Sequence, residues 1–277
     1  MSAAAPRTGS LAGVAMLNAV AGLAARLIQL VIAIALTPFV LGRLGPALYG
    51  ISAAAGSMME YLLLLRGGLG VALRRYVTVT YHAGDRELAA RYYAVGFWWM
   101  AVMRLVVVIA GVALSRWLCA FMRIPPNLMT DATGGVMLIV VAAASSDLGV
   151  LFEVPTYVTG HTARLSMVRI LGAVGKAALV VPAFLVFVPG LTLYAVTVCV
   201  VEVLVAVGIG MVGARAHVVP HVVPRPDFGS REVRNTLFRF GGVGLVSQVA
   251  GILYLATDNL MIGGIYGSEY VTRYSLG

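Results

Sequence analysis

Seven long apolar stretches restrict this chain to a membrane-spanning helical fold. They cover residues 17–41, 47–65, 92–114, 135–154, 165–188, 191–212 and 240–262. Each has about the 20 apolar residues that a helix needs to cross the hydrocarbon core of a bilayer. Because 60% of the residues are hydrophobic and only 11% are charged, too little polar surface is left for an ordinary soluble domain. The sequence therefore predicts an all-α integral membrane protein with seven transmembrane helices.

Arginines favour every second loop, and this bias predicts the orientation of the chain. Thirteen arginines lie in the N-terminal segment or in the loops after the second, fourth and sixth stretches, whereas the other loops hold only Arg43, Arg116, Arg123 and Arg273. Basic residues near span ends are retained on the cytoplasmic side. We therefore expect a multi-pass protein of the cytoplasmic (inner) membrane with its N-terminus inside the cell. This orientation also explains the net charge of +9. Since no basic run has interleaved aromatic residues, we expect no nucleic-acid partner.

The predicted spans contain charged residues that need partners or water. The cations are Arg26, Arg104 and Lys176, and the acids are Glu60, Asp147, Glu202 and Asp258. An ionised side chain at the centre of a bilayer costs at least ~2.5 kcal/mol even on lenient scales. Counting residues from the outer turns places one cation and one acid at nearly the same depth in each of three consecutive hairpins. We therefore predict that Arg26 pairs with Glu60, Arg104 with Asp147, and Lys176 with Glu202.

Two interpretations of these charges stay open at this stage. The pairs either hold neighbouring helices together or line one aqueous cavity. Asn18, Gly22, Arg26 and Gln29 fall at helical spacing and form a polar stripe, which must face protein or water rather than lipid. This stripe favours the cavity, and it makes Asn18, Arg26 and Gln29 candidates for a substrate pathway. Arg104, Lys176 and Gln248 are further candidates for the same pathway.

Asp258 has no cation at its depth. It lies near the outer end of the seventh stretch, beside Asn259. An acid near a span end reaches outer water at little cost. The alternative interpretation is that its partners belong to helices that this chain lacks.

Two cytoplasmic segments differ from the spans in composition. Residues 66–91 mix apolar side chains with arginines, which predicts a basic amphipathic segment lying along the membrane surface. Its Arg66, Arg74 and Arg75 are candidates for contact with lipid headgroups or with the anionic headgroup of a substrate. Residues 216–239 are polar and contain several prolines, which is typical of a linker. The predicted divisions are a cytoplasmic N-terminal segment (1–16), a six-helix lobe (17–215), a linker (216–239) and the first helix of an incomplete second lobe (240–277).

Patterns of catalytic and metal-binding residues are absent from the sequence. It contains no Asp-rich motif for divalent metal and polyprenyl phosphate, no nucleophile elbow and no glycine-rich phosphate loop after a strand. The histidines of the linker lack the acidic or cysteine companions of a metal site. We therefore expect no metal site and no cofactor, and transport rather than enzymatic chemistry.

Four segments carry a resemblance to a known family. Residues 37–50 (TPFVLGRLGPALYG), 61–75 (YLLLLRGGLGVALRR), 152–164 (FEVPTYVTGHTAR) and 258–276 (DNLMIGGIYGSEYVTRYSL) resemble the polysaccharide transporter (O-antigen flippase-like) family of the multidrug/oligosaccharidyl-lipid/polysaccharide exporter superfamily. The resemblance extends over almost the whole chain, with loose motifs. One departure is Arg66, which stands where family members often have an acid.

This resemblance implies a flippase of two six-helix lobes with a central cationic cavity for a polyprenyl-pyrophosphate-linked oligosaccharide. The implied partners are that lipid-linked sugar, membrane lipids and polysaccharide assembly proteins, and the implied process is polysaccharide or lipopolysaccharide export. On this interpretation the chain is the N-terminal half, six spans plus one, and would not transport alone. The alternatives are a multidrug or peptidoglycan-precursor exporter of the same superfamily and, from another class, a membrane glycosyltransferase or polysaccharide polymerase.

Overall fold

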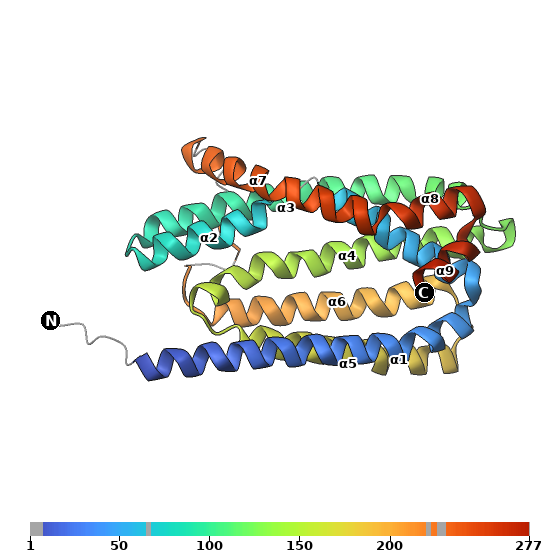
Figure 1. The fold of residues 1–277 in the computed structure, drawn as a ribbon, viewed down its shortest axis with the longest axis horizontal. Helices are drawn as coiled ribbons and strands as arrows, with labels where there is room; N and C mark the ends of the chain where they lie inside the picture. The colour runs from blue at the N-terminus through green and yellow to red at the C-terminus, as the bar shows by residue number, and fades with distance from the viewer. Residues whose placement is uncertain (1–7, 65–67, 220–222, 226–230, 277) are drawn as a thin grey trace.

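The described part of the chain is a bundle of long helices that lie roughly along one axis (Figure 1). The structure is a computed structural model and describes residues 8–64, 68–219, 223–225 and 231–276. None of these residues forms a strand. The helices are α1 (Thr8–Leu63), α2 (Leu69–His82), α3 (Arg86–Phe121), the 3₁₀ turn η2 (Pro126–Leu128), α4 (Met129–Val158), α5 (Ala163–Val186), α6 (Leu191–Ala214), α7 (Arg231–Leu255), α8 (Thr257–Tyr266) and α9 (Ser268–Leu276).

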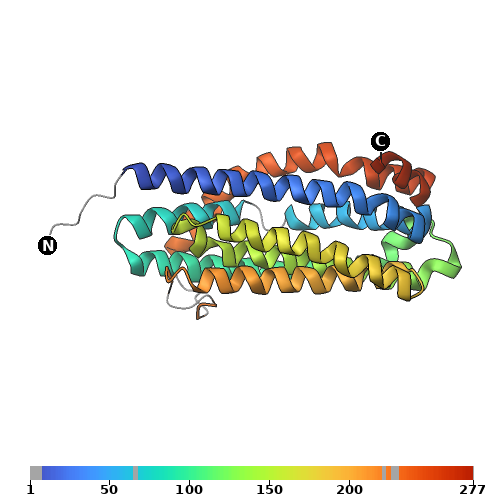
Figure 2. The ribbon, with the colours of Figure 1, turned by 90° about the horizontal axis from the view of Figure 1, so that it is seen from below.

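The helix α1 contains the first two predicted spans. Its backbone leaves the helical conformation at Gly45, which has φ 76° and ψ 166°, a conformation that glycine adopts at little cost. Pro46 follows and has no N–H to continue the hydrogen-bond ladder. The second half of α1 runs back towards the end of the bundle where α1 begins (Figure 2). Within the described residues six helices are long and apolar enough to cross a membrane, the first of them over Ala12–Leu63, and this fold is that of a multi-pass membrane protein.

The C-terminal helices close over this kink at the same end of the bundle (Figure 1). The hydroxyl of Thr272 in α9 donates a hydrogen bond to the carbonyl of Pro46 at 2.6 Å. A side chain at Gly50 would collide with the backbone of Ser268, so this glycine allows α9 to approach α1. The kink is therefore held by packing against α9 as well as by its own backbone.

The predicted seventh span differs from the structure at its start and in its middle. The helix α7 begins at Arg231, inside the segment predicted as a linker and well before residue 240. It ends at Leu255, and α8 continues from Thr257 after a break at Ala256. The predicted linker also contributes Val218 and Val233 to the buried core, because burial removes the apolar side chains of this segment from water.

The basic amphipathic segment forms α2, and protein covers part of its apolar residues. Leu69, Ala72, Leu73 and Val77 are buried, and α2 packs against α3, α4 and α7. The backbone N–H of Gly68 donates to the carbonyl of Gly241 in α7 at 3.0 Å. Val71 and Val79 of the same helix are 52% and 58% exposed, so contact of α2 with the membrane surface stays a prediction, and the structure adds protein contacts that the sequence did not predict.

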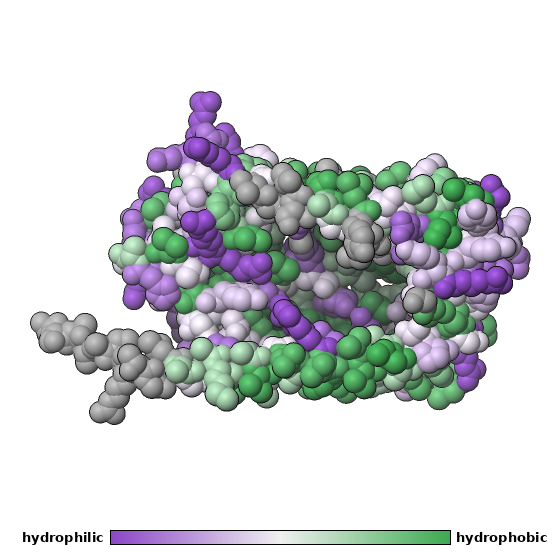
Figure 3. All heavy atoms as spheres, in the orientation of Figure 1, coloured by the Kyte–Doolittle hydropathy of each residue, from purple (hydrophilic) through white to green (hydrophobic). Residues whose placement is uncertain are grey.

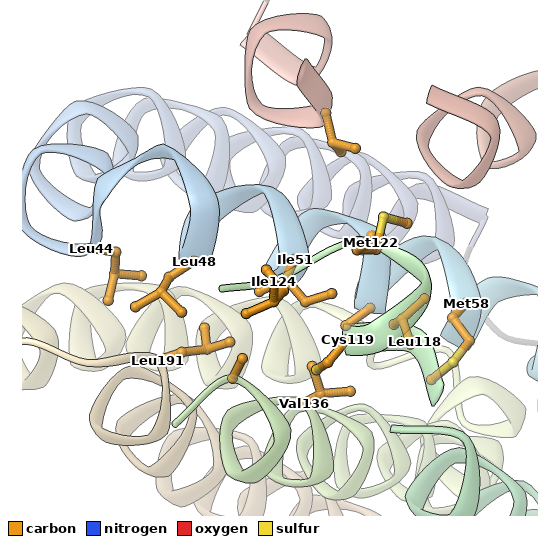
Figure 4. Close-up of a cluster of buried hydrophobic side chains, with 14 of the residues drawn as sticks. Leu44, Leu48, Ile51, Met58, Leu118, Cys119, Met122, Ile124, Val136 and Leu191 are labelled. Atoms are coloured by element: carbon orange, nitrogen blue, oxygen red, sulfur yellow. The ribbon is translucent and has the colours of Figure 1, made fainter. Parts of the chain in front are cut away.

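Two buried apolar clusters support the bundle. One joins the kink region of α1 to the end of α3 and the starts of α4 and α6, and Figure 4 shows Leu48, Ile51, Met122 and Leu191 among its side chains. The other joins α2, the first part of α3, the end of α4 and α7.

Helices α4 and α6 are closely packed, and hydrogen bonds of Asp131 connect them. Its carboxylate accepts hydrogen bonds from the backbone N–H groups of Leu191 (2.7 Å) and Thr192 (2.9 Å), and the Thr192 hydroxyl donates to the carbonyl of Asp131 (3.0 Å). The first N–H groups of a helix have no partner within the helix and favour a negative charge. Asp131 therefore caps α6 from the start of α4.

We predict that Asp131→Ala lowers the free energy of unfolding by about 2 kcal/mol, because it removes two charge-assisted hydrogen bonds between helices. Reversible unfolding in mixed micelles measures this loss. The control is Asp85→Ala, which removes the local cap of α3 on Leu88 and is expected to cost about 1 kcal/mol. A loss for Asp131→Ala no larger than that of the control would contradict the cross-helix role.

Candidate functional site

A polar cavity of about 670 Å³ lies among α1, α4, α5 and α6. Its lining residues all come from the segment predicted as the six-helix lobe. The space-filling view shows the molecule hollowed above the apolar ridge of α1, with hydrophilic surface inside the hollow (Figure 3). A volume of this size falls within the range of about 300–1,000 Å³ that is usual for small-molecule sites.

The polar stripe of the first span faces this cavity. Asn18, Gly22, Arg26 and Gln29 all belong to its lining, as their helical spacing requires. The apolar residues on other faces of the same helix, such as Leu23, Leu30 and Ile34, are more than half exposed and are free to contact lipid. The helix therefore presents its polar face to the cavity and its apolar faces to the membrane.

Lys176 and Glu202 form an ion pair at the cavity wall. The Lys176 Nζ lies 3.2 Å from Glu202 Oε1, and both residues line the cavity. The Lys176 side chain is 31% exposed and that of Glu202 19%, so water reaches the pair. The predicted pairing of these two residues is present in the structure.

Arg104 and Asp147 also pair as predicted, but away from the cavity. Their side chains are only 7% and 9% exposed, and neither residue belongs to the cavity lining. The pair joins α3 to α4 inside the bundle. Arg104 therefore does not line the polar cavity.

The predicted pair of Arg26 and Glu60 is wrong. Both residues lie in the described part of the chain and are exposed, yet no ion pair joins them. Arg26 faces the cavity and Glu60 does not. Matching depth is not enough for contact, because the two side chains must also point towards each other around their helix axes.

Glu153 and Arg169 form a further ion pair that the sequence prediction missed. Arg169 was counted among the cytoplasmic arginines, but its guanidinium pairs with the Glu153 carboxylate at the cavity wall. The Glu153 side chain is 3% exposed and that of Arg169 39%. Glu153 lies five residues before the end of α4 and Arg169 six residues after the start of α5, so the same depth comparison would have found the pair.

Asn18 connects the first helix to the turn between α4 and α5 by hydrogen bonds. Its amide donates to the carbonyl of Gly160 and accepts from the backbone N–H of Ala163 at 2.9 Å. Gly160 has φ 72°, the left-handed conformation that favours glycine at helix ends. Asn18 thus satisfies backbone groups at one end of the cavity as well as lining it.

The remaining candidate residues lie outside the cavity. Asp258 accepts a hydrogen bond from the Tyr274 hydroxyl of α9, so its partner is within this chain and is not a cation. The Gln248 side-chain oxygen is buried without a hydrogen-bond partner among the described residues. Asn259 donates to the Ser57 hydroxyl at 3.0 Å and thereby links α8 to α1.

Two of the three arginines proposed for headgroup contact lie against aromatic rings. The guanidinium of Arg74 is 5.2 Å from the ring centre of Tyr157, and that of Arg75 is 4.5 Å from the ring centre of Phe240. Such cation–π contacts leave the edge of the guanidinium available to other acceptors. Arg66 lies outside the described residues. Within the described residues no group of three or more His, Cys, Asp or Glu side chains could hold a metal ion.

The buried ion pair of Arg104 and Asp147 allows a test of whether each charge stabilises the other. We predict that Arg104→Met lowers the free energy of unfolding by ~3–5 kcal/mol, because it leaves the Asp147 carboxylate buried without its counter-ion. The double variant Arg104→Met/Asp147→Leu is expected to recover at least half of that loss. Glu87→Gln, which removes an exposed pair with Arg91, is the control and should have little effect. Equal losses for the single and the double variant would contradict the pairing.

Comparison with solved structures identifies a likeness in fold. The chain is similar to a protein described as the inward-facing conformation of a multidrug resistance MATE family transporter of the MOP superfamily, with a TM-score of 0.62 at 17% sequence identity. The match covers 90% of this chain and 59% of that transporter, so the chain spans less than two thirds of its length. The sequence matches no protein-family model and no curated protein. The described helices therefore share the helical membrane fold of that transporter.

Proposed function

We propose that this chain belongs to a flippase that moves a polyprenyl-pyrophosphate-linked oligosaccharide across the cytoplasmic membrane for polysaccharide or lipopolysaccharide export. The transporter fold supports the broader class, and the sequence resemblance favours the polysaccharide branch. The observation that carries the substrate proposal is the charge of the cavity around Arg26.

Arg26 gives the cavity its uncompensated positive charge. Three cations line the cavity, namely Arg26, Arg169 and Lys176, against the two acids Glu153 and Glu202. Arg169 pairs with Glu153 and Lys176 with Glu202. Arg26 forms no ion pair with any described residue, and its side chain is exposed to the cavity. The net charge of these five lining residues is therefore +1, and it is located on Arg26.

A guanidinium in this position suits a pyrophosphate. A diphosphate cannot enter hydrocarbon without losing its hydration, whereas a hydrated cavity with a cation replaces part of that solvation. The planar guanidinium donates two parallel hydrogen bonds to phosphate oxygens, and these charge-assisted bonds are stronger than bonds between neutral groups. Gln29 lies on the same face of α1 and offers its amide group to sugar hydroxyls.

The two ion pairs are secondary contacts for the headgroup. Each cation in them already has a carboxylate partner, which weakens its attraction for phosphate. The Lys176–Glu202 pair is partly hydrated, so it can exchange one partner for another more easily than the buried Arg104–Asp147 pair. Rocking of two lobes about the cavity would then alternate its access between the two sides.

Binding and transport of a labelled lipid-linked oligosaccharide test this proposal. We predict that Arg26→Gln weakens binding to the protein in nanodiscs by about 10- to 100-fold, which corresponds to the ~1.5–3 kcal/mol of a hydrogen bond to a charged group. Transport into proteoliposomes should fall with it, in a protein that contains both lobes. The control is Arg43→Gln, which changes an exposed arginine of the same helix that does not line the cavity.

The competing functions predict different results. A drug exporter would bind a lipophilic cation such as tetraphenylphosphonium, and Arg26→Gln would strengthen that binding by removing a like charge. A glycosyltransferase or polymerase would convert the lipid-linked sugar instead of returning it intact. Unchanged binding and transport in Arg26→Gln would remove Arg26 from the mechanism.

A further inference from the structure

A second hollow, an apolar groove of about 440 Å³, lies between α4 and α6. Among its lining residues are Leu148 and Phe152 of α4 and Val203, Val207 and Met211 of α6. These residues occupy different helical faces from the residues of α4 and α6 that line the polar cavity. The groove and the polar cavity are therefore separate sites on opposite sides of α6.

The groove is lined almost wholly by apolar groups that are open to the surroundings. Val203, Val207 and Met211 are 43%, 52% and 55% exposed, and they follow one another at the four-residue spacing of a single helix face. The one hydroxyl in the lining, that of Ser145, donates to the carbonyl of Val141 at 2.9 Å. No polar partner is needed here, so the groove suits a hydrocarbon chain.

The length of the groove matches one leaflet of a bilayer. Along α6 its lining extends from Val203 to Ala214, which corresponds to about 16 Å at 1.5 Å per residue. Half of the ~30 Å hydrocarbon core is about 15 Å. A single acyl chain of one leaflet would therefore fill the groove from end to end.

Two arginines stand at the end where α6 finishes. Arg215 directly follows Ala214, and Arg225 lies two residues after Val223, which is itself part of the groove lining. Both arginines are exposed. The indole N–H of Trp98 donates to the carbonyl of Pro224 at 2.8 Å and so fixes this short segment beside the groove. Positive charge at the interface end of an apolar groove complements a phospholipid with an anionic headgroup.

We propose that the groove binds one anionic phospholipid from the leaflet at the arginine-rich end of the bundle. Its acyl chain lies between α4 and α6, and its phosphate contacts Arg215 and Arg225. Because the segment around Pro224 precedes α7, the bound lipid braces the connection between the first six spans and the seventh.

Photo-crosslinking locates this lipid. The full chain is reconstituted in phosphatidylcholine vesicles that contain phosphatidylglycerol with a diazirine in its acyl chain. After illumination, adducts are expected to concentrate on peptides that contain Leu148–Phe152 or Val203–Met211. The same diazirine on phosphatidylcholine should give several-fold fewer adducts there.

Two variants separate the contributions of chain and headgroup. Gly210→Leu fills the groove, and its Cβ would meet the Phe152 ring at an ordinary 3.6 Å, so the helices need not move. We predict that it lowers the adducts in the groove several-fold. Arg215→Gln/Arg225→Gln, which changes only exposed side chains, should reduce phosphatidylglycerol adducts to the phosphatidylcholine level.

Val200→Leu and Arg116→Gln are the matched controls. Val200 is 46% exposed on α6 outside the groove lining, and Arg116 is an exposed arginine of α3; neither substitution should change the adducts. Adducts spread evenly over the exposed faces of α1 and α5 would overturn the proposal, as would groove adducts unchanged in Gly210→Leu. Crosslinks between two copies of the chain through α6, without lipid adducts, would overturn it as well.

Discussion

The cost of a charged group in hydrocarbon governs the arrangement of this bundle. A lone ionised side chain at the bilayer centre costs at least ~2.5 kcal/mol, and helices meet that cost by pairing charges or by enclosing water. Both solutions are present here. Arg104 and Asp147 pair deep between α3 and α4, whereas Lys176, Glu202, Glu153 and Arg169 pair around a hollow. The hollow leaves Arg26 exposed and without a carboxylate partner among the described residues, and this unpaired cation is the basis of the proposal that the cavity takes an anion.

The sequence predicted the depth of the charged side chains along the membrane normal. It predicted only in part the direction in which each of them points around its helix axis. Depth matching identified the pairs of Arg104 with Asp147 and Lys176 with Glu202. It failed for Arg26 and Glu60, because their side chains point to different sides of the hairpin. The stripe of polar residues on the first span did contain directional information, since helical spacing alone placed Asn18, Arg26 and Gln29 on one face. Nothing in the sequence fixed where Glu60 would point after the kink at Gly45.

Other differences between prediction and structure arise where a sequence pattern is compatible with two kinds of contact. The apolar residues of α2 predicted that the helix packs against an apolar surface, but they did not distinguish lipid from protein. In the structure α2 packs against α3, α4 and α7. A search for cations could not find the partner of Asp258, because it is the neutral hydroxyl of Tyr274. The long apolar helices were predictable, since each stretch contains enough apolar residues to cross the bilayer, and six described helices have this length and composition, the first of them over the first two predicted stretches. The break at Ala256 was not, as no Pro or Gly marks it.

The close packing of α4 and α6 separates the two candidate sites. A side chain at Gly135 would collide with Leu191, and one at Gly213 would collide with the backbone of Phe152, so these glycines let the two helices approach closely. Asp131 fixes the same pair at one end. The helices form a wall with the charge-lined cavity on one side and the apolar groove on the other. Because Arg26 stands on α1, across the cavity from this wall, a headgroup bound there would not need the wall to move. A lipid in the groove would therefore act on the connection to α7 rather than on the contacts of the headgroup.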